Sequence, residues 1–335
     1  MKRLRWLIPL FLIGAAVAGW FGFKSWIASG TSPTAPGQPF YVRYETQTSL
    51  EKVLRELSGR GVVKNVDAFM WYSKLQGGGK PVARGTYQLR PGMSVKEIFA
   101  ALREPVRQMV RIPETNWARR TANLLEDKYN VARANDYMEL VQRPGEFKND
   151  VSFPLPTDSL EGYLFPDTYD LPPLLGARNV IERQLRAFEQ KVWNGLNQPK
   201  NLHRLITVAS MVEMEAGTDV DRYRIAGVIE NRIKRGMRLQ IDATILYGMQ
   251  KWRRLTYDDY RNQRHAYNTY LIDGLPPGPI CSPSFASIKA AMEPAQHNYL
   301  YYVALPDGTS IFSSDYAGHL ANIRRRRAAL KAAGQ

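Results

Sequence analysis

The stretch LHRLITVASMVEMEA, residues 202–216, decides how the C-terminal part of the chain folds. Its apolar side chains recur at intervals of three and four residues, which predicts a helix with one apolar face against a core. The residues of that face are Leu205, Val208, Ala209, Val212 and Ala216. Glu213 and Glu215 flank the face. Successive residues of a helix turn by about 100°, so these two carboxylates point roughly 200° apart and only one can face a given cleft.

Glu215 has the more apolar surroundings of the two. Met211 and Val212 precede it by four and three residues, whereas a serine stands three residues before Glu213. An apolar environment raises the pKa of a carboxyl group because it disfavours the charged form. A raised pKa is what a general acid needs near neutral pH. The residues alone also allow the ordinary alternative, in which Glu215 is a solvated residue at the edge of a buried face.

A second helix and several rigid loops are predicted around this segment. Residues 220–235 carry apolar side chains at helical spacing, and Gly236 stands at the C-terminal cap position. Loops rich in Tyr, Asn, Pro and Gly follow at residues 240–248 and 266–280, and residues 159–169 form a similar loop upstream. Aromatic faces and amides suit sugar rings, while Pro and Gly fix a loop. Taken singly, each of these residues is better explained by an ordinary turn, and the upstream loop fits a cleft wall or a packed turn equally well.

Residues 40–108 predict a small α+β module. Strand-like segments at residues 40–44 and 85–89 enclose two helical patterns, and a third helical pattern follows. Capping-box patterns occur at residues 48–51 and 94–97. From residue 109 to residue 335, longer helices alternate with motif-rich loops and predict a larger mixed α+β domain.

The first 39 residues predict an anchor and a tether. Three basic residues precede an uncharged stretch over residues 6–23, which is just long enough to cross a hydrocarbon layer of about 30 Å. We therefore predict one transmembrane helix within residues 1–28, with membrane contact over residues 4–23. Residues 29–39 are rich in Gly, Pro, Ser and Thr and predict a flexible linker. A cleaved signal peptide is the alternative, and either interpretation predicts export of the remaining chain.

The composition excludes several function classes. A single cysteine in 335 residues excludes an internal disulfide framework and a cysteine zinc site. The four histidines show no ligand spacing, so we predict no metal and no cofactor. The formal charge of +15 and the run Arg324–Arg327 leave nucleic-acid binding as a further interpretation. It ranks last because an exported domain meets little nucleic acid, and basic helices near a membrane more often contact anionic lipid or stay solvated.

Six motifs, taken together in order and spacing, resemble the YceG-like family of endolytic murein transglycosylases. Four lie in the C-terminal domain: ASMVEME at residues 209–215, NRIKRGMRLQIDATILYG at 231–248, YNTY at 267–270 and GLPPGPICSP at 274–283. Two lie upstream: the LysM-like GTYQLRPGMSVKEI at residues 85–98 and EGYLFPDTY at 161–169. The resemblance covers essentially the full chain and implies a LysM-like module over residues 40–108 and a YceG-like catalytic domain over residues 109–335.

The resemblance implies a lytic transglycosylase that cleaves the β-1,4 bond between N-acetylmuramic acid and N-acetylglucosamine inside nascent peptidoglycan strands. The products carry 1,6-anhydromuramoyl ends, and cleavage limits strand length. The enzyme would be a single-pass protein of the inner membrane with its catalytic domain in the periplasm. Peptidoglycan strands are the implied partner, and peptidoglycan synthases are candidate protein partners. The alternative is a non-catalytic, membrane-tethered peptidoglycan-binding protein.

The resemblance also assigns the site residues. Glu215 is the implied catalytic acid, and no metal or cofactor is required because one carboxyl group can protonate the glycosidic oxygen and then accept the proton of the muramoyl C6 hydroxyl. The implied substrate-binding residues are Glu213, Arg232, Gln240, Asp242, Tyr247, Tyr267, Asn268, Thr269, Tyr270, Pro276 and Pro277. We expect the loop residues of this set to form a wall that faces Glu215.

Overall fold

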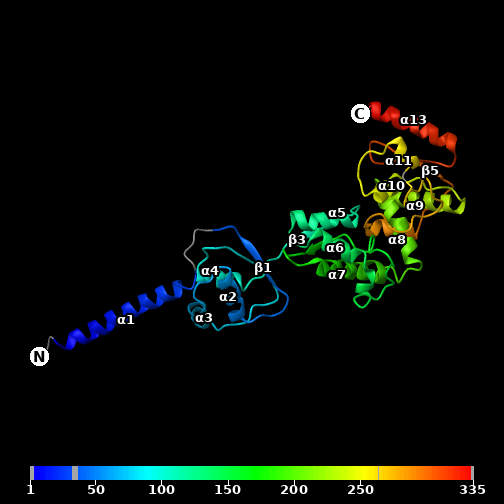
Figure 1. Ribbon diagram of the computed structural model, residues 1–335. Coiled ribbons are helices and arrows are strands. Elements are labelled where there is room, and N and C mark those ends of the chain that lie inside the picture. Colours follow the sequence, from blue (N-terminus) through cyan, green and yellow to red (C-terminus); the bar gives the residue numbers. More distant parts are fainter. Residues whose placement is uncertain (1–3, 32–36, 263, 333–335) are drawn as a thin grey trace. The chain divides into compact units, whose positions relative to one another are not determined.

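The computed structural model confirms the mixed α+β class (Figure 1). It describes residues 4–31, 37–262 and 264–332, with side chains in the first helix from Leu12 onward. The chain divides into two compact units, one formed by residues 1–108 and 171–175 and the other by residues 109–170 and 176–335. Among the described residues the strands pair only as three two-stranded antiparallel sheets, so helices supply most of each core.

The first unit has a small core between one strand pair and its helices. Its elements are α1 (Leu4–Ala28), β1 (Phe40–Tyr44), α2 (Leu50–Gly59), α3 (Val66–Leu75), β2 (Gly85–Leu89) and α4 (Val95–Ala101). β1 and β2 pair antiparallel with Val42 opposite Tyr87. Leu54, Phe69 and Ile98, one from each of three helices, are fully buried in the same cluster. The strand–helix–helix–strand order therefore encloses a core of its own.

Local hydrogen bonding decides where two of these helices begin. The predicted capping box of α4 is confirmed, because Ser94 and Glu97 exchange side-chain and backbone hydrogen bonds. The predicted box at residues 48–51 is wrong by one residue. Ser49 caps α2, since the backbone of Thr48 is already hydrogen-bonded to Val82 in an isolated bridge.

Helix α1 covers most of the predicted anchor. Within the part of the chain that the structure describes, no helix is both long enough and apolar enough to cross a membrane. The predicted linker at residues 29–39 lies partly outside the described residues, at 32–36. Its described ends are held to the first unit, because Lys64 donates its backbone N–H to Gly30 and Gly37 donates to Pro91.

The second unit is mostly helical. Its N-terminal elements are β3 (Met109–Arg111), α5 (Ala118–Asn123), the π-helix Leu124–Lys128, α6 (Ala134–Val141), the 3₁₀ turn Pro144–Phe147, β4 (Thr168–Asp170), α7 (Ala177–Phe188) and the π-helix Glu189–Asn194. They are followed by α8 (Leu202–Glu215), α9 (Asp219–Lys234), α10 (Asp242–Met249), α11 (Tyr257–Asn262), α12 (Phe285–Met292), β5 (Tyr301–Ala304), β6 (Ser310–Ser313) and α13 (Tyr316–Ala332). β3 pairs with β4 and β5 with β6.

Helix α8 is the centre of this unit and packs against α9, α10 and α12. The helix is confirmed, but it is buried on all sides along most of its length instead of on the single predicted face. Its polar residues Thr207 and Ser210 are also buried, and each hydroxyl donates to a carbonyl one turn earlier in the helix. Side chains of α8 reach the surface only near its two ends, at His203 and Arg204 in the first turn and at Met214 and Glu215 in the last.

Candidate active site

Glu215 is the last residue of α8, and its side chain lies on a cavity of about 440 Å³. The walls come from α8, α9, α10, β5 and α13. The lining residues are Glu215, Arg232, Leu239, Gln240, Asp242, Tyr270, Tyr301, Tyr302, Val303, Ala304, Tyr316, His319, Ile323 and Arg326. The cavity thus joins two carboxylates, two guanidinium groups and several aromatic rings, a set suited to a polar ligand with flat apolar faces.

The carboxyl group of Glu215 is set for proton transfer near neutral pH. Burial raises its pKa to about 7, and the negative charge of Asp242 acts in the same direction. Two groups oppose this rise: the hydroxyl of Tyr302, which donates a hydrogen bond of 3.0 Å to Oε2, and the positive charge of Arg232. A carboxyl group with a pKa close to the working pH can give up a proton and take one back in the same catalytic cycle.

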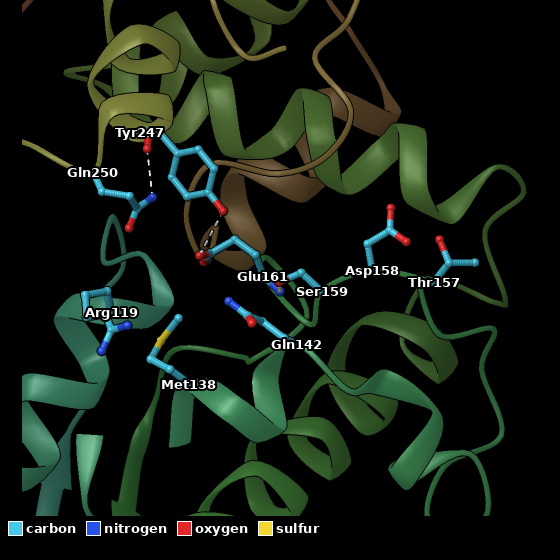
Figure 2. A pocket seen from close by; sticks show the side chains of 9 residues that line it. All are labelled: Arg119, Met138, Gln142, Thr157, Asp158, Ser159, Glu161, Tyr247 and Gln250. Carbon is cyan, nitrogen blue, oxygen red and sulfur yellow. Dashed lines mark hydrogen bonds between the residues drawn. The ribbon is translucent and has the colours of Figure 1, made fainter. Parts of the chain in front are cut away.

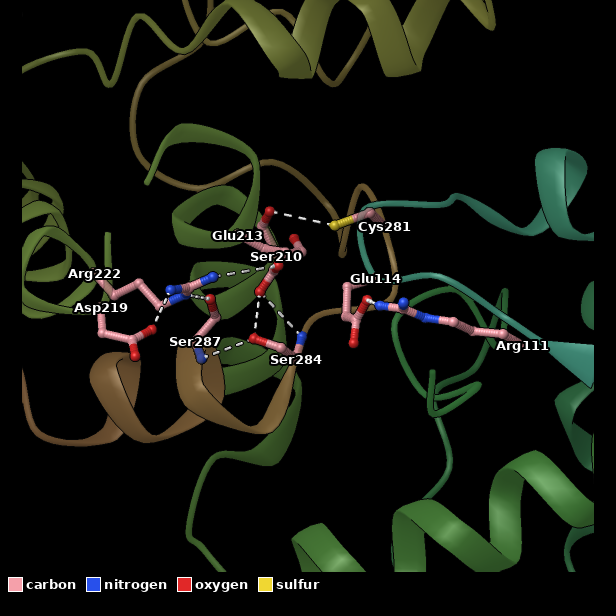
Figure 3. Close-up of polar contacts among 9 residues, drawn as sticks. All are labelled: Arg111, Glu114, Ser210, Glu213, Asp219, Arg222, Cys281, Ser284 and Ser287. Atoms are coloured by element: carbon pink, nitrogen blue, oxygen red, sulfur yellow. Dashed lines mark hydrogen bonds and ion pairs between the residues drawn. The ribbon is translucent and has the colours of Figure 1, made fainter. Parts of the chain in front are cut away.

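Glu213 points into the protein on the other side of α8. Its Oε2 accepts hydrogen bonds from the backbone N–H and hydroxyl of Ser284, the residue that caps α12. Its Oε1 lies 3.8 Å from the guanidinium of Arg222. Figure 3 shows this network between α8, α9 and α12. Glu213 was predicted to bind substrate. In the structure it is buried, does not line the Glu215 cavity and links α8 to α9 and α12. The angle of roughly 200° between the two carboxylates accounts for their different directions.

Arg232 lines the cavity, but it does not present its full guanidinium to it. Its Nε donates to the carbonyl of Leu300 at 2.7 Å, and its Nη1 donates to the carbonyls of Leu239 and Arg238. The group also lies over the ring of Tyr301. A buried guanidinium needs such partners, because its charge is costly to desolvate. Arg232 therefore holds β5 and the segment before α10 in place, and its charge acts on Glu215 at a distance.

Three more predicted residues lie on the Glu215 cavity: Gln240, Asp242 and Tyr270. The carboxylate of Asp242 accepts hydrogen bonds from the hydroxyls of Tyr270 and Tyr260, at 2.7 and 3.2 Å. Asp242 is the first residue of α10 and does not cap it, since the cap residue is Ile241. The two tyrosine hydroxyls thus fix the direction of its side chain beside the cavity.

Asn268 and Thr269 lie behind the cavity wall and are fully buried. Asn268 accepts the backbone N–H of Tyr270, and Thr269 accepts that of Ile241. Polar side chains buried in a loop satisfy the backbone around them. These two residues therefore do not face Glu215, but they fix the segments that carry Gln240 and Tyr270.

The other predicted wall residues do not line the Glu215 cavity. Pro276 is buried, and Pro277 is exposed and accepts a hydrogen bond from His203 through its carbonyl. Tyr247 and Tyr267 pack against each other, with ring centroids 4.8 Å apart. The hydroxyl of Tyr247 donates to Glu161, and both residues line a second cavity.

This second cavity, of about 910 Å³, is shown in Figure 2. Its lining residues are Arg119, Met138, Gln142, Thr157, Asp158, Ser159, Glu161, Tyr247 and Gln250. Glu161 is buried and accepts hydrogen bonds from the backbone N–H of Ala118 and the hydroxyl of Tyr247. Burial raises its pKa to about 7. The loop at residues 159–169 thus contributes to a cavity wall, one of the two alternatives that its composition allowed.

Sequence reasoning missed the wall opposite Glu215. All four residues of β5, Tyr301–Ala304, line it, together with four residues of α13: Tyr316, His319, Ile323 and Arg326. The four residues of α13 are spaced by three, four and three positions, which places them on one face of the helix. This spacing and the aromatic run at residues 299–302 were the available signals.

Comparison with known proteins identifies the family. Residues 42–325 match the YceG-like family. The chain belongs to this family. A Bacillus subtilis protein named endolytic murein transglycosylase is 32% identical over 291 residues, which cover 81% of this chain and 80% of that protein. A Streptococcus pneumoniae protein of the same name is 27% identical over 350 residues, covering 94% of this chain and 63% of its own length.

A solved structure also resembles the chain. The crystal structure of a YceG-like protein from Listeria monocytogenes superposes with a TM-score of 0.57 and 28% sequence identity. The match covers 85% of this chain and 99% of the Listeria chain. The architecture described above is therefore that of the YceG-like family.

Proposed function

We propose that this YceG-like protein is an endolytic murein transglycosylase that cleaves the β-1,4 bond between N-acetylmuramic acid and N-acetylglucosamine within peptidoglycan strands. The observation that carries the proposal is Glu215, a carboxyl group with a pKa raised to about 7 at the edge of a polar and aromatic cavity. Relatives across most of the chain bear the name of this activity. We assign Glu215 as the catalytic acid and base.

Glu215 acts first as the acid. The protonated carboxyl gives its proton to the glycosidic oxygen, and the bond from that oxygen to C1 of the muramoyl sugar breaks. The hydrogen bond from Tyr302 stabilises the carboxylate that remains. Asp242 adds a fixed negative charge to the same cavity, which favours the positive charge that develops on the sugar ring.

Glu215 then acts as the base. Its carboxylate accepts the proton of the muramoyl C6 hydroxyl while the C6 oxygen bonds to C1. The carboxyl is restored, no water is consumed, and the product end is a 1,6-anhydro sugar. One carboxyl group suffices for both steps, which fits a helix end where Glu215 reaches the cavity and Glu213 is held by Ser284 and Arg222.

The N-terminal part supports two subsidiary proposals. The strand–helix–helix–strand order of the first unit and the motif at residues 85–98 support a LysM-like glycan-binding module. The uncharged residues 6–23 behind three basic residues support a single-pass anchor in the inner membrane, with the second unit in the periplasm. Such a tether would concentrate the enzyme where peptidoglycan synthases release new strands.

Fractionation of membranes tests the anchor. The full chain should stay with membranes after a carbonate wash, and a variant without residues 1–24 should be released. Release of the full chain as well as the variant would contradict the anchor.

The test of the activity is digestion of uncross-linked glycan strands with mass analysis of the products. An endolytic lytic transglycosylase cuts within the strand and leaves fragments with 1,6-anhydromuramoyl ends. Each such fragment is lighter by one water than the fragment with a reducing end that a hydrolase would leave. Reducing ends would contradict the mechanism. Unchanged strands would favour the non-catalytic peptidoglycan-binding alternative.

A further inference from the structure

Helix α13 forms one wall of the Glu215 cavity through Tyr316, His319, Ile323 and Arg326. The helix packs on β5 and β6, and Figure 1 shows it beside β5 at the C-terminal end of the second unit. The rings of Tyr316 and His319 cluster with that of Tyr301, with centroids 4.9 to 6.1 Å apart. This cluster offers an aromatic surface of the kind that carries sugar rings. Arg326 lies on the same face of α13, two helical turns after His319.

Of the two guanidinium groups on this cavity, that of Arg326 is the less engaged with the protein. The other guanidinium, that of Arg232, already donates to three backbone carbonyls. Arg326 is exposed, and within the described parts of the chain it forms no hydrogen bond or ion pair. Its seven-residue separation from His319 corresponds to about 10 Å along the helix axis. An arginine at that distance can reach a group that projects from the sugar, and its planar fork matches a carboxylate.

The neighbouring arginines differ from Arg326 in one respect. Arg324, Arg325 and Arg327 are also exposed on α13, but they do not line the cavity. Adjacent residues of a helix point about 100° apart, so Arg325 and Arg327 face away on either side. The arginine run therefore contains one residue directed to the site and three that share only its charge.

We propose that Arg326 binds a carboxylate carried by the muramoyl unit of the strand, which makes α13 a specificity element of the site. This inference rests on the proposed function and names part of its substrate. The carboxylate has two sources: the peptide stem, or the lactyl group once the stem has been removed. A strand whose carboxylates have been converted to neutral amides offers neither.

The experiment compares the full-length wild-type chain with Arg326→Ala, Arg326→Lys and the matched control Arg325→Ala. Each protein digests three substrates: stem-bearing strands, strands denuded by an amidase, and stem-bearing strands with amidated carboxylates. We expect Arg326→Ala to raise KM about fivefold on a carboxylate-bearing strand, the size of a solvent-accessible ion pair, with kcat nearly unchanged. Arg326→Lys should recover part of this loss, and Arg325→Ala should match the wild type.

The substrate arms separate the outcomes. A loss confined to stem-bearing strands identifies the stem as the source, and a loss on denuded strands identifies the lactyl group. An equal loss on amidated strands would overturn the proposal, because no carboxylate is then involved. An equal loss in Arg325→Ala, or no loss in Arg326→Ala, would overturn it too.

A binding measurement separates failure of this inference from failure of the proposed function. Calorimetry with soluble stem-bearing and amidated muropeptides on the Glu215→Gln protein requires no cleavage. If the stem-bearing muropeptide binds Glu215→Gln/Arg326→Ala more weakly than it binds Glu215→Gln, the carboxylate site is supported even if the wild type cuts no strand. Equal binding of the stem-bearing and amidated muropeptides to the Glu215→Gln protein overturns it even if the wild type is active.

Discussion

Tyr302 donates its hydroxyl hydrogen to Oε2 of Glu215 at 3.0 Å, and so a strand residue 87 positions later in the chain orients the carboxyl at the end of α8. Tyr302 and Glu215 both lie on the cavity whose other walls are α9, α10 and α13. The bond lowers the pKa of Glu215, against the larger effect of burial. Burial, which raises the pKa of this carboxyl, is thus partly offset by the hydrogen bond from Tyr302, which lowers it.

Removing that hydroxyl tests the balance. In Tyr302→Phe the ionised form of Glu215 loses a hydrogen bond, so the pKa of the carboxyl rises and the group stays protonated to higher pH. The alkaline limb of the pH profile of kcat/KM should move up by about half a unit to one unit. Tyr301→Phe, which changes a neighbouring ring, is the control and should leave the limb in place. A limb that stays put or moves down in Tyr302→Phe would show that the bond does not tune the acid.

The raised pKa of Glu215 also predicts how stability depends on pH. Its carboxyl has a folded-state pKa of about 7 against an ordinary value of 4.5. Its contribution to stability is therefore complete below the ordinary value and is lost as pH rises through the folded-state pKa. Glutamine cannot ionise, so Glu215→Gln should melt at a higher temperature than the wild type at about pH 8 and lose that advantage at about pH 4. A constant difference in melting temperature across this range would contradict a raised pKa.

Replacement of Glu213 should change the stability of the protein and leave the catalytic step intact. Replacing it by Gln weakens the contacts with Ser284 and Arg222 inside the protein. We expect the free energy of unfolding to fall by about 1–3 kcal/mol, the cost of impairing a buried charged hydrogen-bond network. Denaturant unfolding measures this loss, and glycan cleavage by the folded fraction should persist. A stable variant without activity would place Glu213 in the reaction.

The sequence predicts α8 well because periodicity and the angle between neighbouring residues are local properties. The same arithmetic separates Glu213 from Glu215 without any knowledge of tertiary contacts. It also explains one miss on α10. Asp242 and Tyr247 are five residues apart, which turns their side chains by about 140° relative to each other, so one helix supplies two different cavities.

The rest of the site depends on contacts between distant segments. Tyr302 and Arg326 follow Glu215 by 87 and 111 positions and reach it only when β5 and α13 pack beside α8 and α9. Asn268 and Thr269 have the composition of a binding loop, but the loop's own backbone uses their hydrogen-bonding groups. Arg232 is of the residue type that binds a carboxylate, but its Nε and Nη1 donate to three backbone carbonyls instead. Such competition is decided by tertiary packing, which no local pattern encodes.

The most direct test of the central claim is the activity of Glu215→Gln on uncross-linked glycan strands, measured by mass analysis beside the wild type and Glu213→Gln. Glutamine keeps the shape of the side chain and removes its transferable proton. We predict a loss of about 100-fold or more in the formation of 1,6-anhydro ends, the usual contribution of a general acid, together with intact folding and glycan binding. If Glu215→Gln keeps more than about a tenth of the wild-type rate, Glu215 is not the catalytic acid.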